Sequence, residues 1–510
     1  MTRLRALLSR VRGVHLAPVL AFLALAAWAF ASPIGAGPDD DYHLTSTWCA
    51  LDGSAQCEPG SGTSTREVST ALDEIACFAA VAEKSAACQD AVLAGWNHDT
   101  LETRRGNFAG EYPPVYYAVM HVFAGADLQV SALAMRLVNA ALFVALATAL
   151  AALLPAGRRP SLLWGWLVTL VPLGMFLIPS NNPSGWALTG VGTAFLALTG
   201  WFETSGARRV ALGALALVGV LMAAGARGDA AVYAAGAMVT ATILAGPWRA
   251  RPWRTWWRWA WLPAVGILVS GAFFAVSGQA GVAGDGFGGS GGSVPGGADN
   301  PTGFALAAYN LLMLPLLWTG VWGTSALGWM DTGLPEIVPW AAAAAFIVLG
   351  FTGLGGIDRR KALAASGVLA VLVVLPLWVL TRSGNVVGEN LQPRYLLPLI
   401  VLFAFILLTM PGGVGPRLTR AQTVVVLAAL ALANLVALQV DIRRYVTGAD
   451  RQGFDLDAGA EWWWTGFPVG PTAVWVLGSL AYAGTLALLW PQLRRPASLA
   501  ADPAAASVAG

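Results

Sequence analysis

The sequence predicts an all-α polytopic membrane protein, and two observations lead to this fold class. Of the 510 residues, 56% are hydrophobic and only 11% are charged, whereas about a quarter of the residues in soluble domains are charged. Apolar runs of about 17–22 residues recur along almost the whole chain, and a helix of this length crosses a hydrocarbon core of roughly 30 Å. We therefore expect no soluble domain of ordinary size and no nucleic-acid partner.

Thirteen segments are long and apolar enough to be candidate spans. In chain order they are residues 14–33, 132–154, 161–179, 185–202, 208–225, 230–246, 259–277, 304–322, 336–353, 362–381, 394–410, 421–441 and 470–490. Their orientation follows from charge, because Lys and Arg collect in the short cytoplasmic loops of membrane proteins. Residues 1–13 carry four Arg and no acid, so we expect the N-terminus to be cytoplasmic.

One candidate segment does not fit a simple alternation of inside and outside. Four further basic clusters should all be cytoplasmic: 158–159, 208–209, 249–258 and 359–361. Thirteen crossings would place the last of them outside, unless residues 304–322, with Pro315 in the middle, enter and leave on the same face. A re-entrant or surface-lying helix is tolerated where protein buries its backbone. We therefore predict twelve spans in a transmembrane domain at 14–490, with a cytoplasmic tail at 491–510.

Two long hydrophilic stretches, 35–131 and 278–303, fall on the outer face. In residues 66–96, apolar residues recur at three- and four-residue spacing, which is typical of amphipathic helices. We expect these helices to cover the outer mouth of the domain. Residues 278–303 have glycine at nearly every second position and cannot form a core of their own. They are either a mobile flap over a site or a plain flexible linker.

All four cysteines lie in the outer stretch 35–131. An even number confined to one exported loop indicates two disulfides, most simply Cys49–Cys57 and Cys77–Cys88. Three pairings are possible, and four free thiols are the alternative.

The first apolar run also resembles a signal peptide, because Ala29-Phe30-Ala31 fits the small-residue pattern of a cleavage site. The run is longer than a signal core of about 7–15 residues, so we expect it to remain as the first span.

The densest acidic cluster follows the first span directly. It is Asp39-Asp40-Asp41, and Pro38 restricts how the backbone leaves the span. A solvated turn is the plainest interpretation of three acids at the end of a span. The cluster could also hold a divalent cation through Asp39, Asp40 and His43, since carboxylates suit hard cations, but the spacing is not diagnostic. We expect that no cofactor is required and keep a divalent cation as the alternative.

Residues 38–43, Pro-Asp-Asp-Asp-Tyr-His, resemble the signature of a bacterial family of polytopic membrane proteins known as domain of unknown function 2142, which is grouped with the GT-C glycosyltransferases. Further pieces follow in the order of that family: Tyr112–Tyr117 (YPPVYY), Arg136-Leu137, Asn182–Gly185 (NPSG), Gly323–Pro335 (GTSALGWMDTGLP) and Gln392–Tyr395 (QPRY). The likeness spans about residues 15–445. The sequence departs from the family at Asp40, where Glu is commoner, and at Pro393, where Gly is commoner.

The resemblance implies a GT-C-like fold and an inverting glycosyltransferase at the outer face of the bacterial plasma membrane. Such an enzyme moves a sugar from a polyprenyl-phosphate donor to a cell-envelope glycan or glycolipid acceptor. A carboxylate can accept the proton of the acceptor hydroxyl, and we predict Asp39 as this base, with Asp40 as the second choice. Arg presents a planar fork that suits two phosphate oxygens. Arg394 is the first candidate for the donor phosphate and Arg227 the second, although Arg227 could simply pair with Asp229.

Nine further residues are candidates for contact with substrate: His43, Glu111, Tyr112, Tyr116, Asn182, Asp331, Gln392, Tyr395 and Trp463. Several have plainer alternatives. The tyrosines could shape the entry of the outer loop into the membrane, and Trp463 could anchor the protein at the membrane interface. His43 could orient a carboxylate or be solvated.

A transporter or flippase of lipid-linked envelope precursors is the competing hypothesis, and a non-catalytic scaffold is a third. Transport leaves ionisable groups deep in the spans or at midplane helix breaks. Here the charged motifs gather at the outer face, which favours chemistry. The residues do not distinguish one sugar or acceptor from another.

Overall fold

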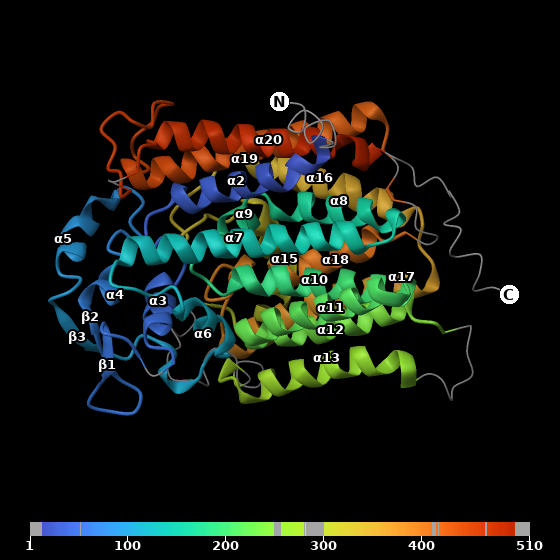
Figure 1. The fold of residues 1–510 in the computed structure, drawn as a ribbon, viewed down its shortest axis with the longest axis horizontal. Helices are drawn as coiled ribbons and strands as arrows, with labels where there is room; N and C mark the ends of the chain where they lie inside the picture. Colours follow the sequence, from blue (N-terminus) through green and yellow to red (C-terminus); the bar gives the residue numbers. More distant parts are fainter. Residues whose placement is uncertain are drawn as a thin grey trace, which may run out of the picture.

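A computed structural model of the protein describes residues 13–51, 53–248, 257–279, 281, 300–410, 415–416, 418–464 and 467–494. Most of its helices run along one common direction and form a single bundle (Figure 1). The long helices are α2 (Ala17–Ala31), α7 (Leu128–Leu153), α8 (Arg159–Leu170), α10 (Ser184–Glu203), α11 (Gly206–Ala226), α12 (Gly228–Ala245), α13 (Trp257–Val276), α15 (Gly303–Thr319), α16 (Ile337–Leu354), α17 (Arg359–Ser383), α18 (Pro393–Leu408), α19 (Arg420–Val446) and α20 (Pro471–Arg494).

Nine helices in the described part of the chain are long and apolar enough to cross a membrane, and α2 and α18 are apolar but shorter. This confirms the all-α, multi-pass membrane class, whereas the number of spans stays a prediction. The helix bounds follow the predicted segments closely. For example, α10 occupies residues 184–203 where the sequence predicted 185–202.

The segment predicted at 161–179 is broken rather than continuous. Helix α8 ends at Leu170, and the short helix α9 (Leu173–Leu177) begins after Pro172. Proline lacks the N–H that an α-helix needs and disfavours helical geometry in the residue before it. Val171 accordingly has extended backbone, with φ −89° and ψ 129°. After α9 the chain reaches the turn at 180–183, which lies beneath the site described below.

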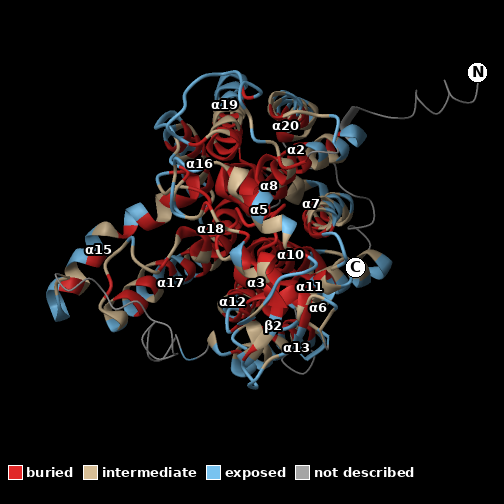
Figure 2. Ribbon diagram, turned by 90° about the vertical axis from the view of Figure 1, so that its left-hand side faces the viewer, coloured by how far each residue is buried: buried red, intermediate tan, exposed pale blue. Residues whose placement is uncertain are grey.

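Helix α15 runs across the bundle rather than along it, since it is seen from the side in Figure 2, where most other long helices are seen end-on. Asn300, just before α15, donates hydrogen bonds to the Gly384 carbonyl and to Glu389. At its other end, a Cβ on Gly320 would overlap Pro393. The start of α15 therefore lies beside the connection between α17 and α18. Its end lies beside the first residue of α18 and the middle of α17, where the Trp318 indole donates a hydrogen bond of 3.1 Å to the Leu372 carbonyl. Whether the segment 304–322 crosses the membrane stays a prediction.

A small cap covers one end of the bundle (left in Figure 1). Its helices and turns are α3 (Asp40–Trp48), α4 (Thr70–Glu74), η2 (Ala86–Cys88), α5 (Gln89–Ala94), η3 (Asn107–Ala109) and α6 (Val115–His121). It also contains an antiparallel sheet of three strands, β1 (Cys57–Pro59), β2 (Arg66–Ser69) and β3 (Thr100–Thr103). The prediction of helices alone for 66–96 was therefore incomplete, because Val68 is buried in β2 between Cys57 and Leu101.

The cap contains both disulfides in the simplest predicted pairing. Cys49–Cys57 joins the end of α3 to β1, and Cys77–Cys88 joins the segment after α4 to the end of η2. Their Cα atoms are 5.3 Å and 6.2 Å apart, within the range that a disulfide spans. The pairing is confirmed, and it fixes α3, which follows the acidic cluster.

Candidate functional site

The turn between α2 and α3 presents one acid to solvent. Of residues 31–48, all of which the structure describes, Asp39 is the only one before Cys49 that is not buried. Its backbone is left-handed, with φ 59° and ψ 24°, a conformation that Asp tolerates better than most residues. Helix α3 begins immediately afterwards at Asp40. Local geometry therefore turns the first acid outward and the next two into the protein.

Asp39 lies between two arginines from distant parts of the chain. Its Oδ2 accepts a hydrogen bond of 2.5 Å from Nη2 of Arg394, and its Oδ1 lies 3.3 Å from Nη2 of Arg105. Burial, the largest single effect, would raise the pKa of Asp39, but the charge and hydrogen bond of Arg394 together with the charge of Arg105 and the other lowering effects hold the pKa well below its ordinary value. Asp39 is therefore an ionised carboxylate at neutral pH. The fold thus brings together the two first candidates of the sequence, Asp39 as base and Arg394 as phosphate ligand.

Asp40 has a different environment and no access to solvent. Its Oδ2 accepts a hydrogen bond of 3.0 Å from the Gly37 amide and lies 3.7 Å from Arg136. Its Oδ1 is buried without a hydrogen-bond partner among the described residues. Burial raises the pKa of Asp40 to about 6 even though Arg136 opposes that shift. This position does not favour Asp40 as the residue that meets an acceptor.

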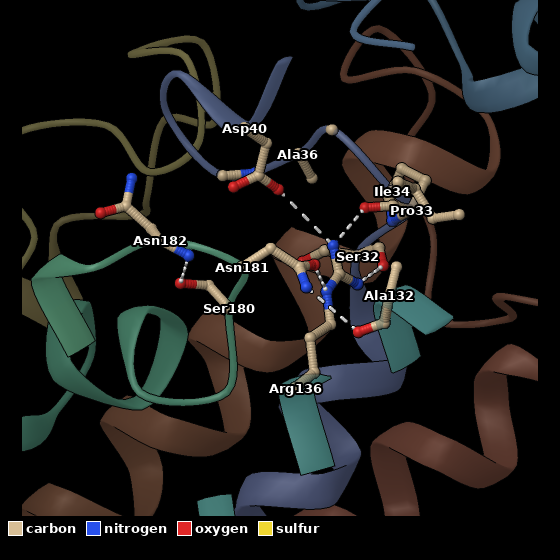
Figure 3. Close-up of polar contacts among 12 residues, drawn as sticks. Ser32, Pro33, Ile34, Ala36, Asp40, Ala132, Arg136, Ser180, Asn181 and Asn182 are labelled. Atoms are coloured by element: carbon tan, nitrogen blue, oxygen red, sulfur yellow. Dashed lines mark hydrogen bonds and ion pairs between the residues drawn. The ribbon is translucent and has the colours of Figure 1, made fainter. Parts of the chain in front are cut away.

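Arg136 organises the underside of the turn. Figure 3 shows its guanidinium surrounded by Asp40, Asn181 and the backbone of Ser32 and Pro33. It donates hydrogen bonds of 2.7 Å and 2.8 Å to the carbonyls of Ser32 and Pro33, and its Nε donates to Asn181. It also donates a hydrogen bond of 3.1 Å to the Ala29 carbonyl in the last turn of α2, and so satisfies an acceptor that the helix end leaves open.

Asn182 and Arg394 hold the same backbone group from two other sides. The Asn182 side chain donates a hydrogen bond of 2.7 Å to the Pro38 carbonyl, and Nη1 of Arg394 donates one of 2.9 Å to it. Asn182 is completely buried. The structure thus places this predicted substrate residue beneath the turn, where it supports the backbone of Asp39.

Arg227 lies beside Arg394 but is engaged with its own acid. It forms two hydrogen bonds of 2.9 Å with Asp229, which is the pairing that the sequence left open. Its guanidinium also lies 4.7 Å from the ring centre of Tyr395, and that of Arg394 lies 5.0 Å from the same ring. Tyr112 provides a second ring, 5.5 Å from Arg227. Two buried cations therefore share one aromatic neighbour next to Asp39.

His43 joins the same cluster through tyrosines. Its Nδ1 is 2.8 Å from the Tyr117 hydroxyl, and its ring packs edge-on against Tyr112 with centroids 5.3 Å apart. Burial keeps the pKa of His43 well below its ordinary value, so the ring is neutral. Tyr42, the preceding residue, donates a hydrogen bond of 2.9 Å to the exposed Glu111. His43 and Tyr112 thus pack together near Asp39, and Glu111 is linked to them through Tyr42, whereas their contact with substrate stays a prediction.

Four other candidates lie deeper in the fold or outside this cluster. Asp331 forms a buried ion pair of 2.7 Å with Arg444. Trp463 packs against Tyr445, with ring centroids 6.3 Å apart. Tyr116 is buried against Trp186. Gln392 is half-buried at the start of α18.

Arg105 was not predicted as a site residue, and Asp41 was named only as a member of the acidic cluster. Nε and Nη2 of Arg105 both donate to the Asp41 carboxylate, with 2.8 Å for the Nη2 contact. The available signal was the pair Arg104-Arg105, which is unusual in an acidic outer loop. Each acid of the triplet therefore faces an arginine: Asp39 faces Arg394 and Arg105, Asp40 faces Arg136, and Asp41 faces Arg105.

The described residues contain no group of three or more His, Cys, Asp or Glu side chains that could hold a metal ion. The acids of the cluster face guanidinium groups instead. Arginine forks of this kind also bind phosphate and carboxylate oxygens.

Comparison with known proteins places the chain in one family. A sequence model described as "Predicted membrane protein (DUF2142)" matches residues 22–403. No curated protein and no solved structure matches the chain. The matched region contains the turn of Asp39 together with Arg136, Arg227 and Arg394. Because the match covers well over half of the 510 residues, the chain belongs to the DUF2142 family of membrane proteins.

Proposed function

We propose that the protein is an inverting glycosyltransferase with a GT-C-like fold, which moves a sugar from a polyprenyl-phosphate donor to a hydroxyl of a cell-envelope glycan or glycolipid. The observation that carries this proposal is the pairing of the half-buried Asp39 with the buried Arg394. It combines a carboxylate that can take a proton with a cation that can take a phosphate. The tyrosines around them offer ring faces and hydroxyl groups to a sugar.

Arg394 is the proposed ligand of the donor phosphate. It lies in the first turn of α18, where the helix N-terminus adds a partial positive charge. Arg227 is near enough to share the Tyr395 ring, so a phosphate at Arg394 also interacts with a second cation. Both guanidinium groups are positioned to stabilise the negative charge that develops on the leaving phosphate.

Asp39 is the proposed general base. The acceptor oxygen forms a bond to the anomeric carbon while the bond from that carbon to the phosphate oxygen breaks. The electron pair leaves with the polyprenyl phosphate, and the hydroxyl proton passes to Asp39. The pKa of free Asp39 is low chiefly because of Arg394. A phosphate that shares Arg394 offsets this charge, and the carboxylate becomes a stronger base when the donor is bound.

The proposed membrane arrangement has twelve spans, with α15 lying at the outer face and both termini inside. Two disulfides in the cap support an oxidising, extracytoplasmic location for that end of the bundle. A lipid-linked donor has its reactive carbon at the bilayer surface, and the acidic turn follows the end of α2 at the cap.

Turnover by purified protein tests the proposal. The protein is incubated with a panel of polyprenyl-phosphate hexoses and pentoses and with octyl glycosides as acceptors. Asp39→Asn should reduce kcat by about 10²- to 10⁴-fold, the usual contribution of a general base. Asp90→Asn is the matched control, since Asp90 is an exposed acid of the same cap, and should equal wild type.

Two results would contradict the proposal. One is transfer by wild type that Asp39→Asn leaves unchanged. The other is movement of the lipid-linked sugar across vesicle membranes with no new glycosidic bond, which would favour the flippase.

A further inference from the structure

The two oxygens of Asp39 face very different surroundings. Oδ2 faces Arg394, whose side chain is 2% exposed, whereas Oδ1 faces Arg105, whose side chain is 42% exposed. Arg394 belongs to α18 of the bundle, and Arg105 belongs to the cap between β3 and η3. Solvent therefore reaches the carboxylate from the side of Arg105. The opposite side of the carboxylate is occupied by the Arg394 guanidinium, the group that we propose as the ligand of the donor phosphate.

The accessible side of Asp39 carries a short row of polar and aromatic groups. The Arg105 guanidinium lies 5.9 Å from the ring centre of Tyr42. The hydroxyl of Tyr42 is bonded to Glu111, which is exposed. An exposed cation and an exposed carboxylate are thus linked on this side through the buried Tyr42.

The backbone that carries this row is braced. The Asn107 amide donates a hydrogen bond of 2.8 Å to the Ser46 hydroxyl in α3. The Asn107 side chain forms two further bonds of 2.8 Å with the backbone of Tyr112. One bond ties Asn107 to α3, and the other two tie Tyr112 to Asn107. Arg105 and Glu111 therefore hold a fixed spacing across Asp39.

We propose that Arg105, Tyr42 and Glu111 form the acceptor subsite, which binds the terminal sugar of a carbohydrate acceptor with its attacking hydroxyl at Oδ1 of Asp39. This inference rests on the proposed function and adds the direction from which the acceptor arrives. The hydroxyl takes the place that Nη2 of Arg105 occupies in the structure. Sugars match this row, because Arg donates hydrogen bonds to neighbouring hydroxyls and Glu accepts them. The buried Tyr42 holds Glu111 through its hydroxyl and packs its ring beside Arg105.

Replacement of Arg105 by an acceptor hydroxyl at Oδ1 of Asp39 is favoured by the geometry of the two ion pairs. The contact between Asp39 and Arg105 is 3.3 Å, whereas that between Asp39 and Arg394 is 2.5 Å. Exposed ion pairs contribute little to stability, so a hydroxyl can replace the longer contact. Asp41 binds Arg105 through two nitrogens and keeps it at the rim after Asp39 is released. Arg105 is then available to the hydroxyls of the bound sugar.

Donor and acceptor therefore bind on opposite sides of one carboxylate, and their Michaelis constants should respond to different residues. Arg105→Ala should raise the acceptor KM by about tenfold and change the donor KM by less than about twofold. Arg394→Ala should act mainly on the donor. Arg105→Lys should recover part of the loss, since Lys keeps the charge but not the fork. Arg104→Ala is the matched control, because Arg104 is the exposed neighbour.

Glu111→Gln is a second variant, and it leaves Arg105 in place. The amide oxygen of Gln can still accept the Tyr42 hydrogen bond. The variant should also raise the acceptor KM. Thermal unfolding of each variant in detergent checks that the cap is intact.

The inference is overturned if wild type transfers sugar and Arg105→Ala leaves the acceptor KM unchanged. It is also overturned if Arg105→Ala changes both KM values alike, or only raises kcat, as a residue that merely masks Asp39 would. If wild type transfers no sugar from any donor of the panel, the proposed function fails and the subsite fails with it.

Discussion

Three neighbouring acids, Asp39, Asp40 and Asp41, differ chemically because each is turned toward a different part of the fold. Asp39 is half-buried beside Arg394, Asp40 is fully buried near Arg136, and Asp41 binds Arg105 on the rim. The pKa of Asp39 falls while that of Asp40 rises to about 6. Burial raises both pKa values and a guanidinium lowers both, but Arg394 lies 2.5 Å from Asp39 whereas Arg136 lies 3.7 Å from the fully buried Asp40.

Asp40 gives a prediction about pH and stability. Burial raises its pKa from the ordinary 3.8 to about 6, so the folded state binds a proton more tightly than the unfolded state does. The folded state therefore loses on the order of 3 kcal/mol through this group as the pH rises from about 4 to above 6. Asp40→Asn removes this loss. Its melting temperature in detergent should match wild type near pH 4 and exceed it above pH 6.

The pKa of Asp39 shifts in the opposite direction to that of Asp40. The test therefore compares the melting temperatures of wild type and Asp40→Asn. The folded pKa of Asp39 is depressed, so the stability that this residue contributes is present above its ordinary pKa of 3.8 and is lost as the pH falls below that value. Wild type and Asp40→Asn share this effect, and it cancels in their comparison. A melting difference that stays constant from pH 4 to 7 would refute the assignment to Asp40.

At the scale of elements, the contact of α10 with α11 depends on glycine. A Cβ on Gly190 would lie 2.5 Å from the Gly219 carbonyl, and a Cβ on Gly219 would lie 2.6 Å from the Ala194 amide. Small residues let two helix backbones approach closely in a membrane, where van der Waals packing rather than water drives association. Any side chain at this crossing must push the two backbones apart.

Gly219→Ala should therefore destabilise the protein, by about 1–3 kcal/mol as for other overpacked cores. Gly236→Ala in α12 is the control, because a Cβ there meets nothing within 4 Å among the described residues. It should be neutral or slightly stabilising, since alanine favours the helix. Melting curves of the two variants in the same detergent measure the difference. Equal melting temperatures would show that α10 and α11 do not pack as closely as their glycines indicate.

At the scale of the whole molecule, the path of the chain through the membrane is testable by labelling. Every cysteine of the chain is in a disulfide, so a single added cysteine reports its own location. Thr302→Cys and Thr324→Cys flank α15 at exposed positions. If α15 does not cross, a membrane-impermeant maleimide should label both in intact cells. Arg359→Cys, predicted to be cytoplasmic, should react only after the cells are permeabilised. Labelling of one flank alone would mean that α15 crosses.

The local pattern of the sequence was sufficient to predict most of the helices and the disulfides. Apolar length located the helices, and the even number of cysteines in one loop led to the pairing that the structure contains. The sheet of the cap was not foreseen, because strands of three or four residues are too short to show a period and are stabilised only by their partners. The break at Pro172 had a visible signal in the proline itself.

The sequence by itself determined the membrane class and the order of the helices, because hydrophobic length is a local property. Short motifs, which are also local, made Asp39 and Arg394 the first candidate site residues. The tertiary structure alone decided that Arg105 joins that pair, that Asn182 and Arg136 support the turn from below, and that Asp331 pairs with Arg444 elsewhere. These contacts connect residues far apart in the chain, and only the packing of the helices brings them within hydrogen-bond distance.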